Sequence, residues 1–198
     1  VSGIKNNVNI FDLEKTAKEF EKALKFISKL VAENKTILFV GTKIQVKNLV
    51  KETAKECGYP YVTERWLGGT LTNFETIFKR VEYFKDLEKK KATGELEKYT
   101  KKERLNFDRE MESLMVKFEG IKNMPKLPDA VFIFDMRKDE TCAREAKIKG
   151  IKIIGITDTN INPETADYPI PANDDAISSV KYILEKTKQC IINSRLIK

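Results

Sequence analysis

The turn VGTKIQ (40–45) is one place in the sequence where residue types and spacing could do chemistry. It follows an apolar run and opens a helical pattern, so its backbone N–H groups and the helix dipole favour an anion. That anion could be a phosphate of a small molecule or of a nucleic-acid backbone. The turn lacks the second glycine and the Gly-Lys-Ser/Thr sequence of established phosphate loops, which favours a plain strand-to-helix turn.

A second candidate group is acidic and lies around the ends of expected strands, where α/β folds usually bind ligands. Its members are Asp135, Asp158, Asp167, Asp174 and Asp175. Carboxylate oxygens suit magnesium, but aspartates also close turns and cap helices, and we favour that second interpretation. The chain contains no histidine, which removes histidine-dependent triads and most catalytic zinc sites. We predict no catalytic residue, metal site or cofactor.

Alternating strands and helices must position these residues. The clearest strands are DAVFIFD (129–135) and IKIIGITD (151–158), which are apolar enough to be covered on both faces. YPYVT and the segment DYPIPANDDA supply shorter extended stretches. The alternation predicts an α/β fold with a mostly parallel sheet and right-handed crossovers. Helices are expected over residues 12–33, 44–57 and 140–149, and a final helix follows Asn173 or Asp174. Asp12 is expected to cap the first helix, and Asn173 or Asp174 the final one.

The stretch between Thr72 and about Met124 interrupts this alternation, because it carries no strand signal. Two apolar stripes at helical spacing, with a polar segment between them, predict a helical hairpin that packs like an antiparallel coiled coil and projects from the body. We therefore assign residues 1–71 and 125–198 to the α/β body and 72–124 to the inserted hairpin. The stripes are Phe74, Ile77, Phe78, Val81, Phe84 and Leu87, and Leu105, Met111, Leu114, Met115, Phe118 and Ile121.

The net charge of +7 over 198 residues makes an anionic partner plausible, with nucleic acid the first choice. Basic residues flank the expected hairpin tip, and such a tip can neutralise phosphates without reading bases. Glutamates interleave with them, so an ordinary solvated coiled coil remains an alternative. These basic residues are Lys89, Lys90 and Lys91 before the tip and Lys101, Lys102 and Arg104 after it.

Other features of the composition narrow the class of protein. No run is long enough to span a bilayer, and no signal-peptide pattern is present. The three cysteines, Cys57, Cys142 and Cys190, lie far apart without zinc-site spacing, which indicates reduced thiols in an intracellular protein.

Six segments of the sequence resemble the bacterial-type ribosomal protein S-two family of the small subunit. They are NIFDLEKT, ILFVGTKIQ, RWLGGTLTNFETI, LPDAVFIFD, DTNINP and IPANDDAI, in the family's order and at its spacing, and together they span essentially all 198 residues. The expected hairpin falls where that family carries a coiled-coil hairpin. The resemblance implies a Rossmann-like (flavodoxin-like) body without catalysis. Family members usually begin with a segment before IFDL that this sequence lacks, so we expect an N-terminal segment to be missing from it.

The resemblance also implies a function. It indicates a structural constituent of the small ribosomal subunit that binds small-subunit ribosomal RNA between head and body. It further implies that the protein helps to dock protein S-one and supports translation initiation. The partners would be that RNA and neighbouring ribosomal proteins, with no membrane and no small-molecule substrate. The location would be the ribosome in the cytoplasm, with an organellar matrix left open.

The segment RWLGGTLTNF joins the expected second strand to the hairpin, and we interpret it as a hinge beside an RNA surface. Gly68 and Gly69 would permit backbone angles or close approaches, and Thr72 or Asn73 would cap the first hairpin helix. Arg65 could meet a phosphate, and Trp66 could pack between body and hairpin or stack on a base. Our candidates for RNA contact are Lys43, Lys47, Arg65, Trp66, Lys79 and Arg80 near the junction and Lys89, Lys90, Lys101 and Lys102 at the tip.

Two rival functions remain at this point. One is a phosphosugar- or nucleotide-binding enzyme that uses Gly41, Thr42 and the strand-end aspartates. The other is a helical-hairpin adaptor outside the ribosome, which would bind its partner without RNA.

Overall fold

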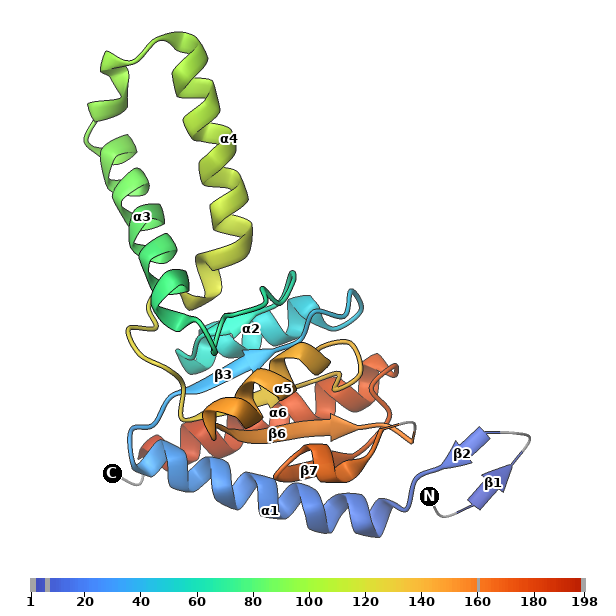
Figure 1. Cartoon of the computed structure of the whole chain (residues 1–198). Coiled ribbons are helices and arrows are strands. Elements are labelled where there is room, and N and C mark those ends of the chain that lie inside the picture. The colour runs from blue at the N-terminus through green and yellow to red at the C-terminus, as the bar shows by residue number, and fades with distance from the viewer. Residues whose placement is uncertain (1–2, 6–7, 160, 197–198) are drawn as a thin grey trace.

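The body is built on a five-stranded sheet in the order β4-β3-β5-β6-β7, with every pairing parallel (Figure 1). The computed structural model describes residues 3–5, 8–159 and 161–196. The fold is therefore α/β, as predicted, and the apolar runs form its central strands. The strands are β3 (Ile37–Val40), β4 (Tyr61–Val62), β5 (Ala130–Ile133), β6 (Lys152–Thr157) and β7 (Tyr168–Pro171).

Helices cover both faces of this sheet, because successive strand residues point to opposite sides. Ile37 and Phe39 pack in one cluster with apolar residues of α1, α2 and α6, whereas Leu38 and Val40 pack with α5 and the base of the hairpin. No helix in the described part of the chain has the length and apolar character needed to cross a membrane. The body helices are α1 (Leu13–Ala32), α2 (Lys47–Cys57), α5 (Glu140–Lys149) and α6 (Ile177–Leu196).

The helix ends agree with the sequence in most places. Asp12 caps α1, since its side chain accepts hydrogen bonds from the backbone N–H groups of Glu14 and Lys15. The second helix begins at Lys47 rather than residue 44, because residues 44–46 form a turn. Before α6, the side chain of Asn173 accepts from the N–H groups of Asp175 and Ala176. An antiparallel pair, β1 (Gly3–Lys5) and β2 (Val8–Ile10), was not expected and lies away from the sheet (Figure 1).

A hairpin projects from the body (Figure 1), and its last segment contacts β4. It contains α3 (Phe74–Ala92), η1 (Glu95–Lys98), α4 (Lys101–Phe118) and η2 (Glu119–Ile121). Val81, Phe84 and Leu87 of α3 share a buried cluster with Leu114 and Phe118 of α4.

The second predicted stripe was partly wrong. Leu105 and Met115 are each 50% exposed, while Phe107 packs against the cluster. Residues 107, 111, 114, 118 and 121 recur at steps of three and four and so share one helical face, which 105 and 115 miss.

A single carboxylate holds the loop that joins β4 to the hairpin. Glu145, from α5, is 6% exposed and accepts five hydrogen bonds from this loop. The donors are Trp66 Nε1 (3.0 Å), the backbone N–H groups of Gly69 (2.8 Å), Leu71 (2.9 Å) and Thr72 (3.1 Å), and Thr72 Oγ1 (3.1 Å). Burial alone would raise the pKa of Glu145, but these hydrogen bonds outweigh it, so the pKa is lowered and the group stays ionised.

The two glycines of this loop differ. Gly69 has a φ of 91°, which a residue with a side chain rarely adopts, whereas a Cβ at Gly68 would meet no atom within 4 Å. Asn73 occupies the N-cap position of α3 without a hydrogen bond to the helix backbone. The hydroxyl of Thr72 is used by Glu145, so this loop is fixed by α5 more than by its own capping residues.

A close backbone contact fixes the second arm of the hairpin, α4 with η2, to the body. In η2, a Cβ built on Gly120 would lie 2.0 Å from the carbonyl oxygen of Tyr61 in β4. Only glycine allows the chain to pass this close. Next to it, Glu119 forms ion pairs with Lys51 at 2.9 Å and Lys55 at 3.2 Å, both on α2.

Replacement of Glu145 by glutamine should destabilise the protein by about 1–3 kcal/mol, because an amide cannot accept from all the loop donors. A depressed pKa in the folded state stabilises the fold above the pKa of the unfolded carboxyl, and this contribution is lost as the pH falls through the folded value. The difference between wild type and Glu145→Gln in urea unfolding should therefore shrink in acid. A difference that stays constant or grows as the pH falls would contradict this role.

The Gly120→Ala variant should lose about 1–3 kcal/mol, because its methyl group collides with the Tyr61 carbonyl. Gly68→Ala is the matched control, since open space surrounds that position. Thermal unfolding should show a clear fall in melting temperature for the first variant and a smaller change for the second. Equal melting temperatures would show that η2 and β4 move apart without cost.

Candidate nucleic-acid interface

The candidate phosphate turn VGTKIQ makes its polar contacts with other side chains of the protein. Lys43 Nζ lies 3.3 Å from Asp135 Oδ2, 2.8 Å from Asp174 Oδ1 and 2.6 Å from Asp175 Oδ1, and its side chain is 13% exposed. Burial alone would lower the pKa of this ammonium, but the hydrogen bonds to Asp174 and Asp175 raise it well above its ordinary value. Lys43 therefore neutralises an acidic cluster at the carboxyl edge of the sheet.

The N–H of Thr42 is also engaged within the fold. Asp139 accepts from the Thr42 backbone N–H at 3.2 Å and from its hydroxyl at 2.8 Å, while Lys138 Nζ donates to the Thr42 carbonyl at 2.9 Å. Burial raises the pKa of Asp139. Asp135 accepts from the backbone N–H groups of Arg137 and Lys138, which is a turn-closing role. The Thr42 N–H and hydroxyl and one Asp135 carboxylate oxygen are thus engaged in contacts within the fold.

Three carboxylates come close enough to be considered as cation ligands. Oxygens of Asp158, Asp174 and Asp175 lie within 4.8 Å of one another. The ammonium of Lys43 already contacts two of these residues and supplies a positive charge there. The cluster is therefore explained by an internal ion-pair network.

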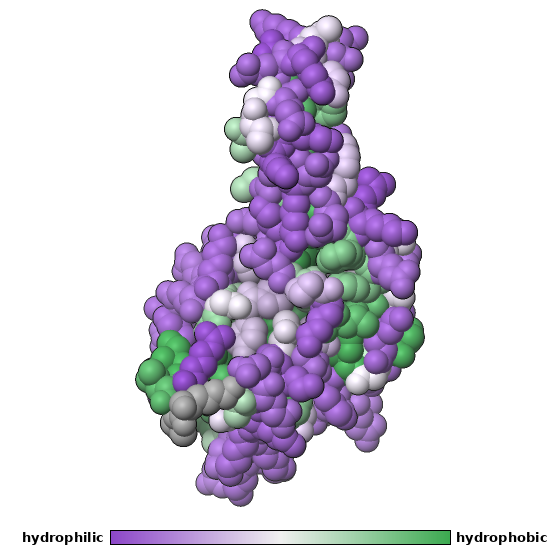
Figure 2. Space-filling view, turned by 90° about the vertical axis from the view of Figure 1, so that its left-hand side faces the viewer, coloured by the Kyte–Doolittle hydropathy of each residue, from purple (hydrophilic) through white to green (hydrophobic). Residues whose placement is uncertain are grey.

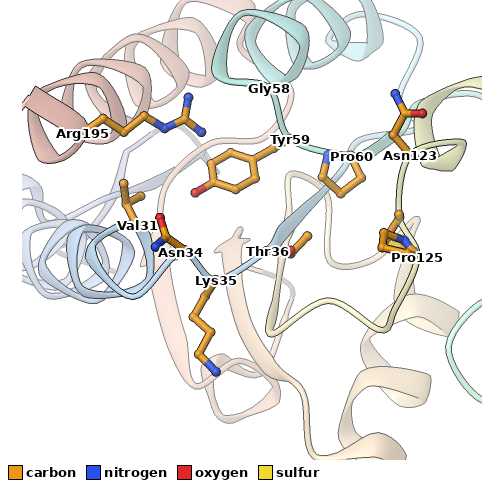
Figure 3. A pocket seen from close by; sticks show the side chains of 11 residues that line it. Val31, Asn34, Lys35, Thr36, Gly58, Tyr59, Pro60, Asn123, Pro125 and Arg195 are labelled. Carbon is orange, nitrogen blue, oxygen red and sulfur yellow. The ribbon is translucent and has the colours of Figure 1, made fainter. Parts of the chain in front are cut away.

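A cavity of about 340 Å³ lies at the amino ends of β3, β4 and β5. Arg195 and Val31 lie at one end of it, Asn123 and Pro125 lie at the other, and Tyr59 lies between them (Figure 3). Arg195 donates to the carbonyl of Cys57 at 2.6 Å, and its guanidinium lies 5.2 Å from the centre of the Tyr59 ring. Three helices, α1, α2 and α6, end around this cavity, and helix C-termini repel anions. Arg195 serves mainly as the cap of α2.

The predicted RNA contacts fall into three groups. Trp66 is buried, with its N–H bound to Glu145, and Lys43 is enclosed by carboxylates. Lys47 pairs with Glu64 at 2.9 Å, and Lys90 pairs with Asp86 at 2.6 Å. Within residues 8–159 and 161–196, the remaining predicted cations form no ion pair. They are Arg65, Lys79, Arg80, Lys89, Lys101 and Lys102.

Other cations of the hairpin also lack an ion pair, although they were not among the predicted RNA contacts. Arg104, Arg109 and Lys117 form no ion pair within the part of the chain that the structure describes. A carboxylate three or four positions away in the sequence does not distinguish paired from unpaired lysines, because helix rotamers decide which pairs form. The visible surface of the hairpin is mostly hydrophilic, with several paler and green side chains among the purple ones (Figure 2).

Comparison with known proteins places this chain among ribosomal proteins. The family model described as "Ribosomal protein S2" matches residues 1–194. The sequence is 45% identical over 191 residues to "Small ribosomal subunit protein uS2" of Dictyoglomus thermophilum, which covers 96% of this chain and 78% of that relative. It is 44% identical over 195 residues to the protein of the same name in Francisella tularensis subsp. novicida, covering 98% and 82%.

These matches span almost the whole chain, including both the sheet and the hairpin, and the parallel sheet agrees with the fold that the resemblance implied. The chain belongs to the ribosomal protein S2 family and is a structural constituent of the small ribosomal subunit.

Proposed function

We propose that the protein binds small-subunit ribosomal RNA, and that the hairpin supplies most of the phosphate contacts. The observation that carries this proposal is the placement of Lys101 and Lys102 in the first turn of α4. A helix N-terminus already bears positive partial charge, so two cations there oppose helix stability instead of supporting it. A bound anion offsets this cost, and both side chains are exposed without an ion pair in the described part of the chain.

The lysines at the end of α3 support the same proposal less directly. Lys89, Lys90 and Lys91 lie in its last turn, where cations stabilise a helix in any case. Lys90 and Lys91 are held by Asp86 and Asp108. Lys89 forms no ion pair within the described residues and so adds to the field at the tip. Such a field attracts phosphates in a salt-dependent way and carries no base specificity.

The internal contacts narrow the proposed contact set. Lys43 and Trp66 act within the fold, because their polar groups are already satisfied by carboxylates. Lys47 and Lys90 would have to exchange Glu64 and Asp86 for phosphate. The direct contacts that we propose are Arg65, Lys79, Arg80, Lys89, Lys101 and Lys102.

Docking of protein S-one and support of translation initiation form a further part of the proposal, which rests on the resemblance to the bacterial-type family. Both roles presuppose a place in the small subunit between head and body. We place the ribosome concerned in the bacterial cytoplasm, and an organellar ribosome is the alternative. Small subunits from cells depleted of this protein should contain less protein S-one, measured by quantitative mass spectrometry. Unchanged S-one content would refute the docking role.

The double variant Lys101→Glu/Lys102→Glu separates RNA binding from folding. Acidic residues in the first turn of α4 should leave thermal stability unchanged or slightly raised. Affinity for purified small-subunit ribosomal RNA should fall at least about tenfold, and the slope of log affinity against log salt should become shallower by about one to two. Occupancy in gradient-purified small subunits should fall in parallel.

Lys18→Glu/Lys149→Glu is the matched control, because it reverses two exposed, unpaired lysines of the body. It carries the same change in net charge and should lose much less affinity. Equal losses in both double variants would mean that total charge, and not the hairpin tip, governs binding. Unchanged RNA binding and unchanged occupancy in the tip variant would rule out its assignment.

A further inference from the structure

A small cleft separates the base of the hairpin from the body on the side of β4. It has a volume of about 190 Å³. Arg65, in the loop after β4, lines it from the body side, and Met115, Val116 and Lys117 line it from the last turns of α4. Sites for small molecules usually measure about 300–1,000 Å³. This cleft is therefore better suited to a segment of an extended chain than to an enclosed ligand.

The cleft holds an excess of positive charge. Arg65 and Lys117 are exposed, and within the described residues neither side chain makes a hydrogen bond, an ion pair or a ring contact. Two further lysines beside it, Lys51 and Lys55, share the single carboxylate of Glu119. The remaining pair, Lys47 with Glu64, is neutral. The lining residues thus include three cations and two carboxylates, and Lys47 and Lys55, which pair with these carboxylates, bring the count to five cations. This excess leaves a field that attracts anions.

The walls of the cleft are held in place before any partner binds. On the body side, the loop that carries Arg65 is tied to Glu145 through Trp66 and the residues that follow. On the hairpin side, Gly120 passes against the carbonyl of Tyr61, three residues after Lys117. Packed backbone therefore fixes where the two cations are attached, so binding one ligand costs the ordering of the two side chains and little backbone entropy.

The apolar side chains of the cleft favour a ligand with carbon surface over a free anion. Met115 is 50% exposed and Val116 is 61% exposed, although both lie beside the cationic groups. Carbon surface next to a positive charge matches a ribose with its phosphate, which presents both kinds of group. An inorganic phosphate would leave Met115 and Val116 in water.

We propose that this cleft seats the sugar–phosphate backbone of one RNA strand. Arg65 and Lys117 bind phosphate oxygens from the body side and the hairpin side, while Met115 and Val116 contact the ribose. The inference rests on the proposed RNA-binding function and extends it with Lys117, Met115 and Val116. Body and hairpin then bind the same RNA strand at the junction, in addition to the contacts at the hairpin tip.

The test compares Arg65→Ala, Lys117→Ala and the double variant with Lys18→Ala/Lys149→Ala, using purified small-subunit ribosomal RNA at several salt concentrations. The double variant should bind about tenfold more weakly than wild type, with a salt slope shallower by about one to two. The control pair should lose markedly less. The two single losses should be non-additive, because both side chains act on one strand. Melting temperatures confirm that each variant folds.

A second pair of variants tests the charge of the cleft without removing a cation. Val116→Glu and Val116→Gln have nearly the same shape and helix propensity at an exposed site. The glutamate should weaken RNA binding by several-fold relative to the glutamine, because it repels phosphate. Equal affinities of these two variants would count against a phosphate at this position.

The outcomes separate the cleft from the wider function. If wild type binds RNA and the Arg65/Lys117 double variant binds as the control pair does, the cleft proposal is overturned while RNA binding stands. If wild type shows no affinity for the RNA, the proposed function itself fails. If RNA affinity is unchanged but the double variant is lost from small subunits, the cleft faces a protein, and the RNA assignment is wrong.

Discussion

The carboxylate of Glu145 is the constraint on which the placement of the hairpin depends. The loop between β4 and α3 runs close to the core, and its N–H groups have no strand or helix partner of their own. A buried N–H without an acceptor costs about as much as a lost hydrogen bond, so without Glu145 this path of the loop would be destabilised. The same carboxylate orients Trp66, which packs between sheet and hairpin. One residue of α5 therefore sets where the cations of the hairpin are presented.

The fold treats the charged groups at the carboxyl ends of its strands differently from those on the hairpin. In parallel α/β sheets, ligands usually bind at the carboxyl ends of the strands. Here that edge is closed by an internal network in which Lys43 neutralises aspartates and Asp139 holds Thr42. Unpaired cations are grouped instead on the hairpin and at its junction, although the body also carries exposed unpaired lysines such as Lys18 and Lys149. The architecture of a ligand-binding fold is thus kept, while the surface that we propose for interaction lies on an appended structure.

Local patterns in the sequence predicted what depends on near neighbours. The runs at 129–135 and 151–158 became β5 and β6, because a strand covered on both faces must be apolar throughout. Leu105 and Met115 were misplaced, because in a polar helix the choice of face depends on the partner helix. Glu145 could not be recognised as the holder of the loop, since it lies 76 residues from Gly69 in the chain. For the same reason the sequence did not reveal that Lys43 faces inward.

Rigidity links this junction to the proposed binding of RNA. Cations on a freely moving hairpin would bind phosphates one by one, and each contact would carry its own entropic cost. The Glu145 network and the contact between Gly120 and Tyr61 fix the base of the hairpin on the body. Binding at one part then holds the other at high effective concentration over the same RNA. Contacts that never touch RNA can therefore determine affinity, because they fix the distance over which the charged groups act together.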